Sequence, residues 1–214
     1  MKLWQKNSTV SEAVEHFTVG KDREMDLLLA PFDVLGSIAH VTMLAEVGLL
    51  TKEEAILVNK ELRNIYKEIQ DSLHAGVHGT FTIHKNIEDI HSQIEFMLTE
   101  RIGEAGKKIH SARSRNDQVL VDIKLFLRNE IRLLAEEVQN LFQLLQVQSE
   151  KFKAHLLPGY THLQLAMPSS FGLWFGAYAE SLVDDITTLQ AAYKVVNKNP
   201  LGSAAGYGSS FPIN

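Results

Sequence analysis

Residues 116–153 decide the fold: they read NDQVLVDIKLFLRNEIRLLAEEVQNLFQLLQVQSEKFK and contain neither proline nor glycine. Apolar side chains recur there mostly at steps of three or four, the spacing of one helical face. They are Val119, Ile123, Phe126, Ile131, Leu134, Val138, Leu141 and Leu145. At 1.5 Å per residue the helix would be roughly 55 Å long. A compact ball of 214 residues does not cover such a helix, so we expect a long bundle with neighbouring subunits.

A second long helix is expected at about residues 168–196. Pro158 and Gly159 end the first helix, and Pro168 is well placed in the first turn of the second. Between Phe171 and Leu182 the second helix is apolar around most of its circumference, which predicts burial on all sides. Two glycines, at 172 and 176, would let a neighbour approach closely. We find no β-hairpin signature.

Shorter helices are expected before residue 110. Val14 and Phe17 share a face with Val10 in a helix that Gly20 ends. After Pro31, a second helix carries a stripe of small and apolar residues and ends at Gly48. The stripe consists of Leu35, Ile38, Ala39, Thr42 and Ala45. A capping box, Thr51-Lys52-Glu53-Glu54, opens a third helix to about residue 73, and a fourth covers about 87–102. The predicted fold is therefore all-α, with a small N-terminal helical domain (1–110) and the first part of a central bundle of long helices (111–214).

Composition excludes several classes of function. The net charge is −5 and the basic residues are scattered, so nucleic acid is not an expected partner. The chain has no cysteine, which excludes disulfides, thiolate metal sites and a cysteine nucleophile. No segment has the roughly twenty apolar residues that a membrane span needs, and the N-terminus lacks the apolar core of a signal peptide. The expected compartment is the cytoplasm.

Three polar clusters stand where helices begin or end. They are DVLGSIAH (33–40); EDIH (88–91) with HSARSRNDQ (110–118); and PGYTHLQ (158–164). In the second cluster, two arginines lie at the start of a long helix, where free N–H groups favour an anion and the guanidinium fork matches a carboxylate. The alternative is a capped helix start with solvated charges, in which Asn116 or Asp117 is the N-cap.

Histidines offer weaker signals. His162 lies between hydroxyl and amide donors in a loop flanked by prolines, which suits general acid–base catalysis, although a structural histidine fits the same pattern. His74 and His78 have the spacing of a metal pair, but Gly76 and Gly79 make a helix there improbable. We therefore expect no metal site.

Together the clusters resemble the argininosuccinate lyase family of the aspartase/fumarase superfamily. RSRNDQ and GYTHLQ in one chain favour this family over the fumarases and adenylosuccinate lyases, and the DxxGSxAH, EDxH and NPLGS runs agree in order and spacing. The resemblance implies a homotetramer with a central helical bundle and active sites built from three subunits. It also implies anti β-elimination of argininosuccinate to arginine and fumarate, without a cofactor or metal.

The resemblance also assigns roles to residues. His162 corresponds to the catalytic histidine, and Thr161 beside it binds a substrate carboxylate. Asn116 and Ser37 hydrogen-bond the substrate, and Arg115 helps to hold a carboxylate. Three further residues line the same site in relatives: Arg113, Asp89 and His91.

Two departures from the family pattern matter. The family commonly begins Leu-Trp-Gly-Gly-Arg-Phe, whereas residues 3–8 read LWQKNS. The family's flexible signature loop, with the serine usually proposed as the base, would lie beyond position 214, so we expect a truncated chain that is inactive alone and associates through the apolar face around Trp174 and Phe175.

Three alternatives remain open. They are a sister lyase acting on another succinylated amine, a crystallin-like structural protein on the same scaffold, and a helical interaction module.

Overall fold

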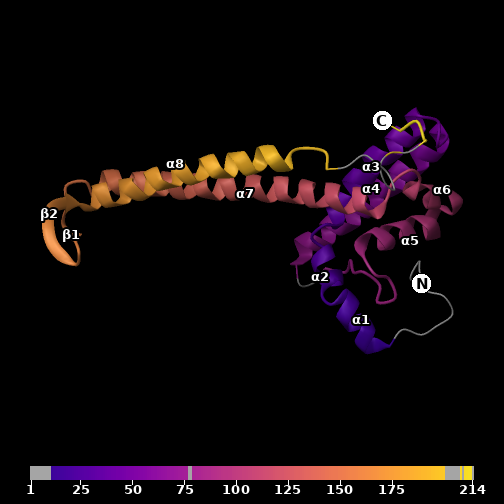
Figure 1. Cartoon of the computed structure of the whole chain (residues 1–214), viewed down its shortest axis with the longest axis horizontal. Coiled ribbons are helices and arrows are strands. Elements are labelled where there is room, and N and C mark those ends of the chain that lie inside the picture. Colours follow the sequence, from indigo (N-terminus) through magenta and orange to yellow (C-terminus); the bar gives the residue numbers. More distant parts are fainter. Residues whose placement is uncertain (1–10, 77–78, 201–207, 209, 214) are drawn as a thin grey trace. The chain divides into compact units, whose positions relative to one another are not determined.

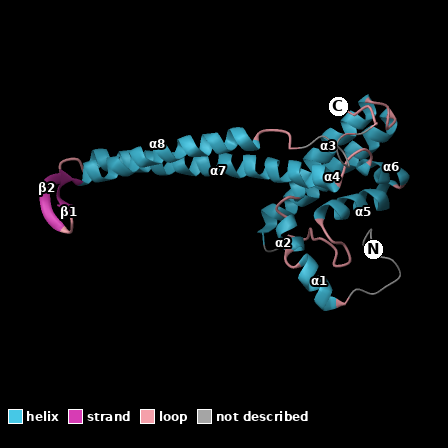
Figure 2. Ribbon diagram, in the orientation of Figure 1, coloured by secondary structure: helices cyan, strands magenta, loops and turns pink. Residues whose placement is uncertain are grey.

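The computed structural model describes residues 11–76, 79–200, 208 and 210–213 (Figure 1). The chain forms two compact units, one of residues 1–126 with 199–214 and one of residues 127–198. Figure 2 shows that helices dominate both units and that the strands form a single hairpin. The all-α prediction is confirmed, apart from that hairpin.

The first unit is a cluster of short helices around one apolar core. Its elements are α1 (Glu12–Val19), α2 (Asp22–Asp26), α3 (Ala30–Glu46), α4 (Lys52–Ala75), α5 (Ile90–Ile102), α6 (Glu104–Lys107), the 3-10 helix η2 (Lys108–His110) and the start of α7 (Arg115–Lys151). Helices α3, α4 and α5 supply most of the fully buried side chains, including Val34, Val41, Leu44, Val58, Leu62, Ile65, Ile90, Ile94 and Leu98. These three helices fix the frame on which the polar residues between them are held.

Helix ends follow the predicted signals closely. The Thr51 hydroxyl accepts a hydrogen bond from the Glu54 N–H, and the Glu54 carboxylate accepts one from the Thr51 N–H, both at 3.1 Å. Gly20 ends α1 with a φ of 54°, which glycine adopts at little cost. Helix α5 begins at Ile90 rather than at residue 87, because Asp89 accepts a hydrogen bond from the Ser92 N–H as its N-cap.

The apolar stripes of the first two helices differ from the faces that these helices bury. Leu35 is 43% exposed, whereas Val34, Ser37, Val41 and Leu44 are buried. The buried face of α3 includes the polar residues Asp33 and Ser37, so its apolar periodicity does not mark the buried face. In α1, Phe17 is 90% exposed, and its predicted neighbour at position 10 lies outside the described residues.

The second unit is an antiparallel pair of long helices, the rest of α7 and α8 (Phe171–Val196) (Figure 1). A Cβ at Gly172 would lie 2.6 Å from the Lys153 Cα, so the predicted close approach at this glycine is confirmed. At Gly176 the nearest atom would be the Ser149 hydroxyl oxygen at 3.6 Å, an ordinary contact. All-round burial of α8 is not found within this chain, where Trp174 is 46% exposed and the buried residues of the helix are Gly172 and Ala179.

Residues 156–170 form a hairpin that the sequence analysis did not predict, and this hairpin also changes the expected position of Pro168. Strands β1 (Leu156–Thr161) and β2 (Gln164–Ser170) pair antiparallel, with Pro158 opposite Pro168. Pro168 therefore lies in a strand and not in a first helical turn; Ser170 caps α8 instead, accepting from the Leu173 N–H. The register shifts beside Gly159, where a Cβ would lie 2.8 Å from the Met167 carbonyl oxygen. Two facing prolines and a turn without glycine or asparagine hide this hairpin from sequence patterns.

Some features discussed above lie outside the described residues. They are the divergent segment 3–8, residues 201–203 of the NPLGS run, and His78, the second histidine of the pair for which no metal binding is expected. Among the described residues, no helix has both the length and the hydropathy needed to cross a bilayer.

Candidate active site

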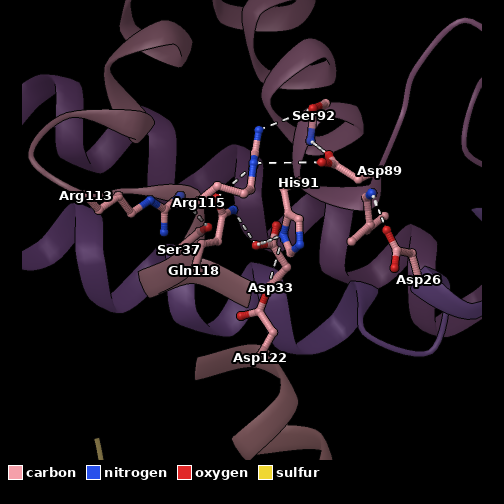
Figure 3. Close-up of polar contacts among 11 residues, drawn as sticks. Asp26, Asp33, Ser37, Asp89, His91, Ser92, Arg113, Arg115, Gln118 and Asp122 are labelled. Atoms are coloured by element: carbon pink, nitrogen blue, oxygen red, sulfur yellow. Dashed lines mark hydrogen bonds and ion pairs between the residues drawn. The ribbon is translucent and has the colours of Figure 1, made fainter. Parts of the chain in front are cut away.

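Six of the eight predicted site residues lie in the first unit, on α3, at the start of α5 and around the start of α7. They are Ser37, Asp89, His91, Arg113, Arg115 and Asn116. Figure 3 shows five of them, all but Asn116, converging with Asp33, Gln118 and Asp122. The other two, Thr161 and His162, belong to the hairpin of the second unit.

The start of α7 is capped by a serine. The Ser114 hydroxyl accepts hydrogen bonds from the N–H groups of Asn116 (3.1 Å) and Asp117 (3.4 Å), and the Asp117 carboxylate accepts from the Ser114 N–H at 2.9 Å. The capped helix start is therefore real, but its N-cap is Ser114 and neither Asn116 nor Asp117. Asn116 is exposed on the first turn, so its amide is free of the capping role.

Two arginines flank this cap and differ in their surroundings. The Arg113 guanidinium donates to the Ser37 hydroxyl at 3.2 Å, and its Nε is buried without a hydrogen-bond partner. Burial lowers the pKa of Arg113, while the nearby Asp33 and Asp122 carboxylates oppose that shift. The planar guanidinium matches a carboxylate in shape and charge, so Arg113 is a candidate to bind one.

Arg115 holds the starts of α5 and α7 together. It donates to the Gln118 side-chain oxygen at 2.9 Å and to the Ser92 hydroxyl at 3.2 Å. Its Nε lies 3.8 Å from the Asp89 carboxylate (Figure 3). Asp89 thus has two structural tasks, as the N-cap of α5 and as the counter-charge of Arg115.

Beneath the arginines lies a buried group formed by Asp33 of α3, His91 of α5 and Asp122 of α7. The His91 Nδ1 lies 2.9 Å from an Asp33 oxygen and 3.4 Å from an Asp122 oxygen. The Gln118 amide also donates to Asp33. Burial and the neighbouring Asp33 carboxylate raise the pKa of Asp122 to about 10. Burial opposes ionisation of Asp33 as well, but the hydrogen bond and charge of His91 lower its pKa.

The same three residues offer ligand atoms within 4.8 Å of one another, a spacing that a metal ion could use. Two neighbours argue for a hydrogen-bonded group instead. The Gln118 amide directs a donor at Asp33, and the Arg113 guanidinium supplies a positive charge to both carboxylates. The guanidinium repels a second cation and balances part of the carboxylate charge itself.

A pocket of about 750 Å³ opens beside this group within the first unit. Its walls include Gly36, His40, Arg113, Asp117 and Gln118. The His40 ring lies 2.8 Å from the Ser111 carbonyl oxygen, and burial together with the charge of Arg113 lowers the pKa of His40 to about 4. His40 is therefore neutral at pH 7, and Arg113 is the cationic side chain among these wall residues.

The hairpin presents Thr161 and His162 at its turn. His162 has a φ of 50° and Leu163 a φ of 64°, and Thr161 pairs with Gln164 across the two-residue turn. Positive φ at both turn residues is the type I′ pattern, which glycine and asparagine favour and leucine does not. Both side chains are exposed, Leu163 to 97%. Backbone strain of this kind is concentrated at functional sites.

Comparisons with known proteins identify the family of this chain. A family model described as "Lyase" matches residues 3–214. The chain belongs to this lyase family, within the aspartase/fumarase superfamily. A curated protein named argininosuccinate lyase from Parabacteroides distasonis is 64% identical over 213 residues, which cover 100% of this chain and 46% of the relative. A protein of the same name from Thermotoga neapolitana is 41% identical and is covered to 52%. This lyase-family chain thus spans about half the length of these relatives.

Solved structures of lyases share the fold. An EDDS lyase with bound fumarate superimposes with a TM-score of 0.72 at 25% identity, over 98% of this chain and 40% of that one. A fumarate lyase:delta crystallin structure from Brucella melitensis gives a TM-score of 0.71 over 94% of this chain and 46% of that chain; at 16% identity this likeness concerns the fold alone.

Sequence reasoning missed Asp122 in this lyase-family chain and gave no role to Gln118, which stands in the second polar cluster. Both are buried, and both contact the site from the first two turns of α7. Their signal was available: they stand four residues apart, so they share a helical face, and this face directly follows the RSRN run. Asp33 was quoted in a motif but received no role.

Proposed function

We propose that the complete protein is an argininosuccinate lyase, which splits argininosuccinate into arginine and fumarate. The observation that carries this proposal is the 62–64% identity to curated proteins of that name along the whole of this chain. The polar groups at the start of α7 support it, because the succinyl half of this substrate carries carboxylates, and the Arg113 guanidinium, which matches a carboxylate in shape and charge, lines the pocket of the first unit.

The roles of the individual residues form part of the proposal. Arg113 and Arg115 hold substrate carboxylates, while Asn116 and Ser37 hydrogen-bond the substrate. Asp89 and His91 line the same site, Asp89 by fixing the position of Arg115. Elimination builds negative charge on a carboxylate in the transition state, and cationic and N–H donors aimed at it lower the barrier.

Proton transfer is assigned to the hairpin. His162 acts as the catalytic acid–base group, and Thr161 binds a carboxylate beside it. The exposed, strained turn supports this assignment, because strain is retained at a surface turn where it serves a purpose. As proposed, neither a metal nor a cofactor takes part in this chemistry.

We further propose a homotetramer whose active sites are shared between subunits. The second unit supports it through apolar side chains that this chain alone leaves exposed on α7 and α8. They include Leu133, Leu134, Leu141, Leu144, Val147, Leu173, Trp174 and Tyr178. Apolar surface on this scale is typical of an interface. The same proposal places residues 1–110 in an N-terminal domain, residues 111–214 in the bundle, and the protein in the cytoplasm.

A direct assay tests the reaction. The complete protein is mixed with argininosuccinate, and fumarate is followed by ultraviolet absorbance while arginine is quantified separately. We expect both products in equal amounts. A folded protein that releases neither product, or that cleaves only another succinylated amine, would replace this function with the structural or sister-lyase alternative.

A further inference from the structure

The strongest unexplained feature is the pair of carboxylates on Asp33 and Asp122. Both side chains are 0% exposed, and they come from different helices, α3 and α7. Their ligand oxygens lie within 4.8 Å of each other and of the His91 Nδ1 (Figure 3). Two ionised carboxylates at this separation in a dry interior repel each other strongly, so the pair requires compensation.

The two carboxylates differ in the donors that face them. Asp33 receives the Gln118 amide and the His91 Nδ1. Neither oxygen of Asp122 has a hydrogen-bond donor of its own, and the His91 Nδ1 is the basic group nearest to it, at 3.4 Å. A buried carboxylate without donors is unfavourable when ionised, so the environment favours an ionised Asp33 and a neutral Asp122.

The backbone brings Asp122 into this position. A Cβ on Gly36 would lie 3.3 Å from the Asp122 Oδ1, so the glycine of the DVLGSIAH run lets α7 carry this carboxyl against α3. Asp33 and Gly36 of that run therefore both lie against Asp122, while the Ser37 hydroxyl of the same run accepts a hydrogen bond from Arg113.

We propose that Asp122 is the protonated member of an acid–carboxylate pair with Asp33, and that this pair positions His91 and Arg113 for the lyase site. The Asp122 hydroxyl donates to Asp33, which keeps one negative charge. That charge accepts from the His91 Nδ1–H and the Gln118 amide, and it balances the Arg113 guanidinium. The N–H on Nδ1 thereby fixes the tautomer of the His91 ring.

The charged and titratable groups that surround Asp122 come from every element packed against it and are consistent with this arrangement. Asp33 comes from α3, His91 from α5, Arg113 from the turn before α7, and Arg115 from α7 itself. Despite the two arginines, burial and the Asp33 charge keep the pKa of Asp122 far above its ordinary value. The geometry thus needs one proton at neutral pH, and the Asp122 carboxyl holds it.

Paired isosteric substitutions test the proposal in the complete protein. In Asp122→Asn, the amide donates to Asp33 as the carboxylic acid did, and its oxygen still faces His91. In Asp33→Asn, the amide directs donors against Gln118 and His91 and leaves Arg113 without its counter-charge. We expect kcat/KM for argininosuccinate to fall at least about 100-fold more in Asp33→Asn than in Asp122→Asn, the size of loss caused by breaking a hydrogen bond to a charged group.

Two further measurements separate positioning from simple packing. Asp122→Ala removes the donor, so it is expected to lose more activity and to unfold at a lower temperature than Asp122→Asn. The unfolding midpoint of the wild type falls as pH rises from about 4 toward 10, because the unfolded chain releases the proton that Asp122 keeps in the folded protein, and that of Asp122→Asn falls less steeply. A packing role alone gives both proteins the same pH profile.

Several results would overturn the proposal. Equal losses in the two Asn variants, or a larger loss in Asp122→Asn, would place the proton elsewhere. A stoichiometric divalent ion in the purified protein, removed by a chelator with a fall in the unfolding midpoint, would make the group a metal site. The kinetic arm rests on the proposed function, but the unfolding arm does not. If the wild type fails to cleave argininosuccinate while Asp122→Asn still flattens the pH dependence of the unfolding midpoint, only the function is lost.

Discussion

The buried polar group of the first unit and the hairpin turn of the second differ in how their side chains are held: one is enclosed and the other is exposed. Asp33, His91 and Asp122 are enclosed, and their positions are set by helices that pack on a common core. His162 and Leu163 are exposed and are held in left-handed backbone conformations by a two-residue turn. In the proposed site, the residues that bind substrate are therefore held rigidly by packed helices, whereas the acid–base residue His162 is exposed at a turn. Mutations in the two regions should therefore separate stability from activity.

The largest expected effect is that of replacing His162, which should lower activity without lowering stability. We expect His162→Asn to lower kcat by about 10²–10⁴, the usual contribution of a general acid–base group. Its unfolding free energy stays within about 0.5 kcal/mol of wild type, as for other exposed side chains. His74→Asn is the matched control, since that ring is exposed and, among the described residues, bonds to the Gln70 carbonyl oxygen within α4. A comparable loss of activity in the control, or unfolding of His162→Asn, would contradict the assignment.

A substitution of Arg115 tests the buried, substrate-binding part of the proposed site. In Arg115→Lys the charge remains, but the fork that contacts Gln118 and Ser92 is lost. We expect kcat/KM to fall by about 10- to 100-fold, equivalent to about 1.5–3 kcal/mol for hydrogen bonds to a charged group. Steady-state kinetics measures the loss, with Arg132→Lys on the exposed face of α7 as control. Wild-type kinetics in Arg115→Lys would remove the arginine from the proposed site.

The pH dependence of stability sharpens the contrast further. The pKa of Asp122 is raised to about 10 in the folded protein from an ordinary 3.8, so the folded state binds a proton that the unfolded state releases. The unfolding free energy therefore decreases as pH rises from about 4 toward 10, by up to about 1.4 kcal/mol per pH unit from this group. Denaturant unfolding at several pH values measures the slope. Asp122→Asn is expected to reduce the slope, and an unchanged slope would contradict the folded-state proton.

The smallest effect is expected at the hairpin tip. Leu163 has a φ of 64°, a conformation that asparagine adopts more readily than leucine. Leu163→Asn is expected to stabilise the hairpin by about 1 kcal/mol by relieving this strain. Slower amide hydrogen exchange in β1 and β2 would report the gain. Faster exchange would show that the leucine side chain contributes more than its backbone costs.

The sequence predicted much of this arrangement, for identifiable reasons. The long helix α7, the Thr51 capping box and the polar clusters at helix ends all depend on local periodicity or hydrogen bonding. The hairpin escaped because its turn residues, His162 and Leu163, lack the usual turn chemistry. Asp122 escaped because a polar residue in an amphipathic helix is read as solvent-facing, whereas α3 at Gly36 and His91 of α5 both pack against it.

Mixing two inactive variants tests the central claim most directly: that the buried group and the hairpin are complementary halves of lyase sites shared between subunits. His162→Asn and Arg115→Ala are co-expressed as the complete protein, and fumarate release is compared with that of each variant alone. We predict activity well above the sum of the two parents, because some sites in mixed tetramers draw an intact half from each. Activity no higher than the average of the parents would show that each subunit builds its own site, or that these regions do not form one.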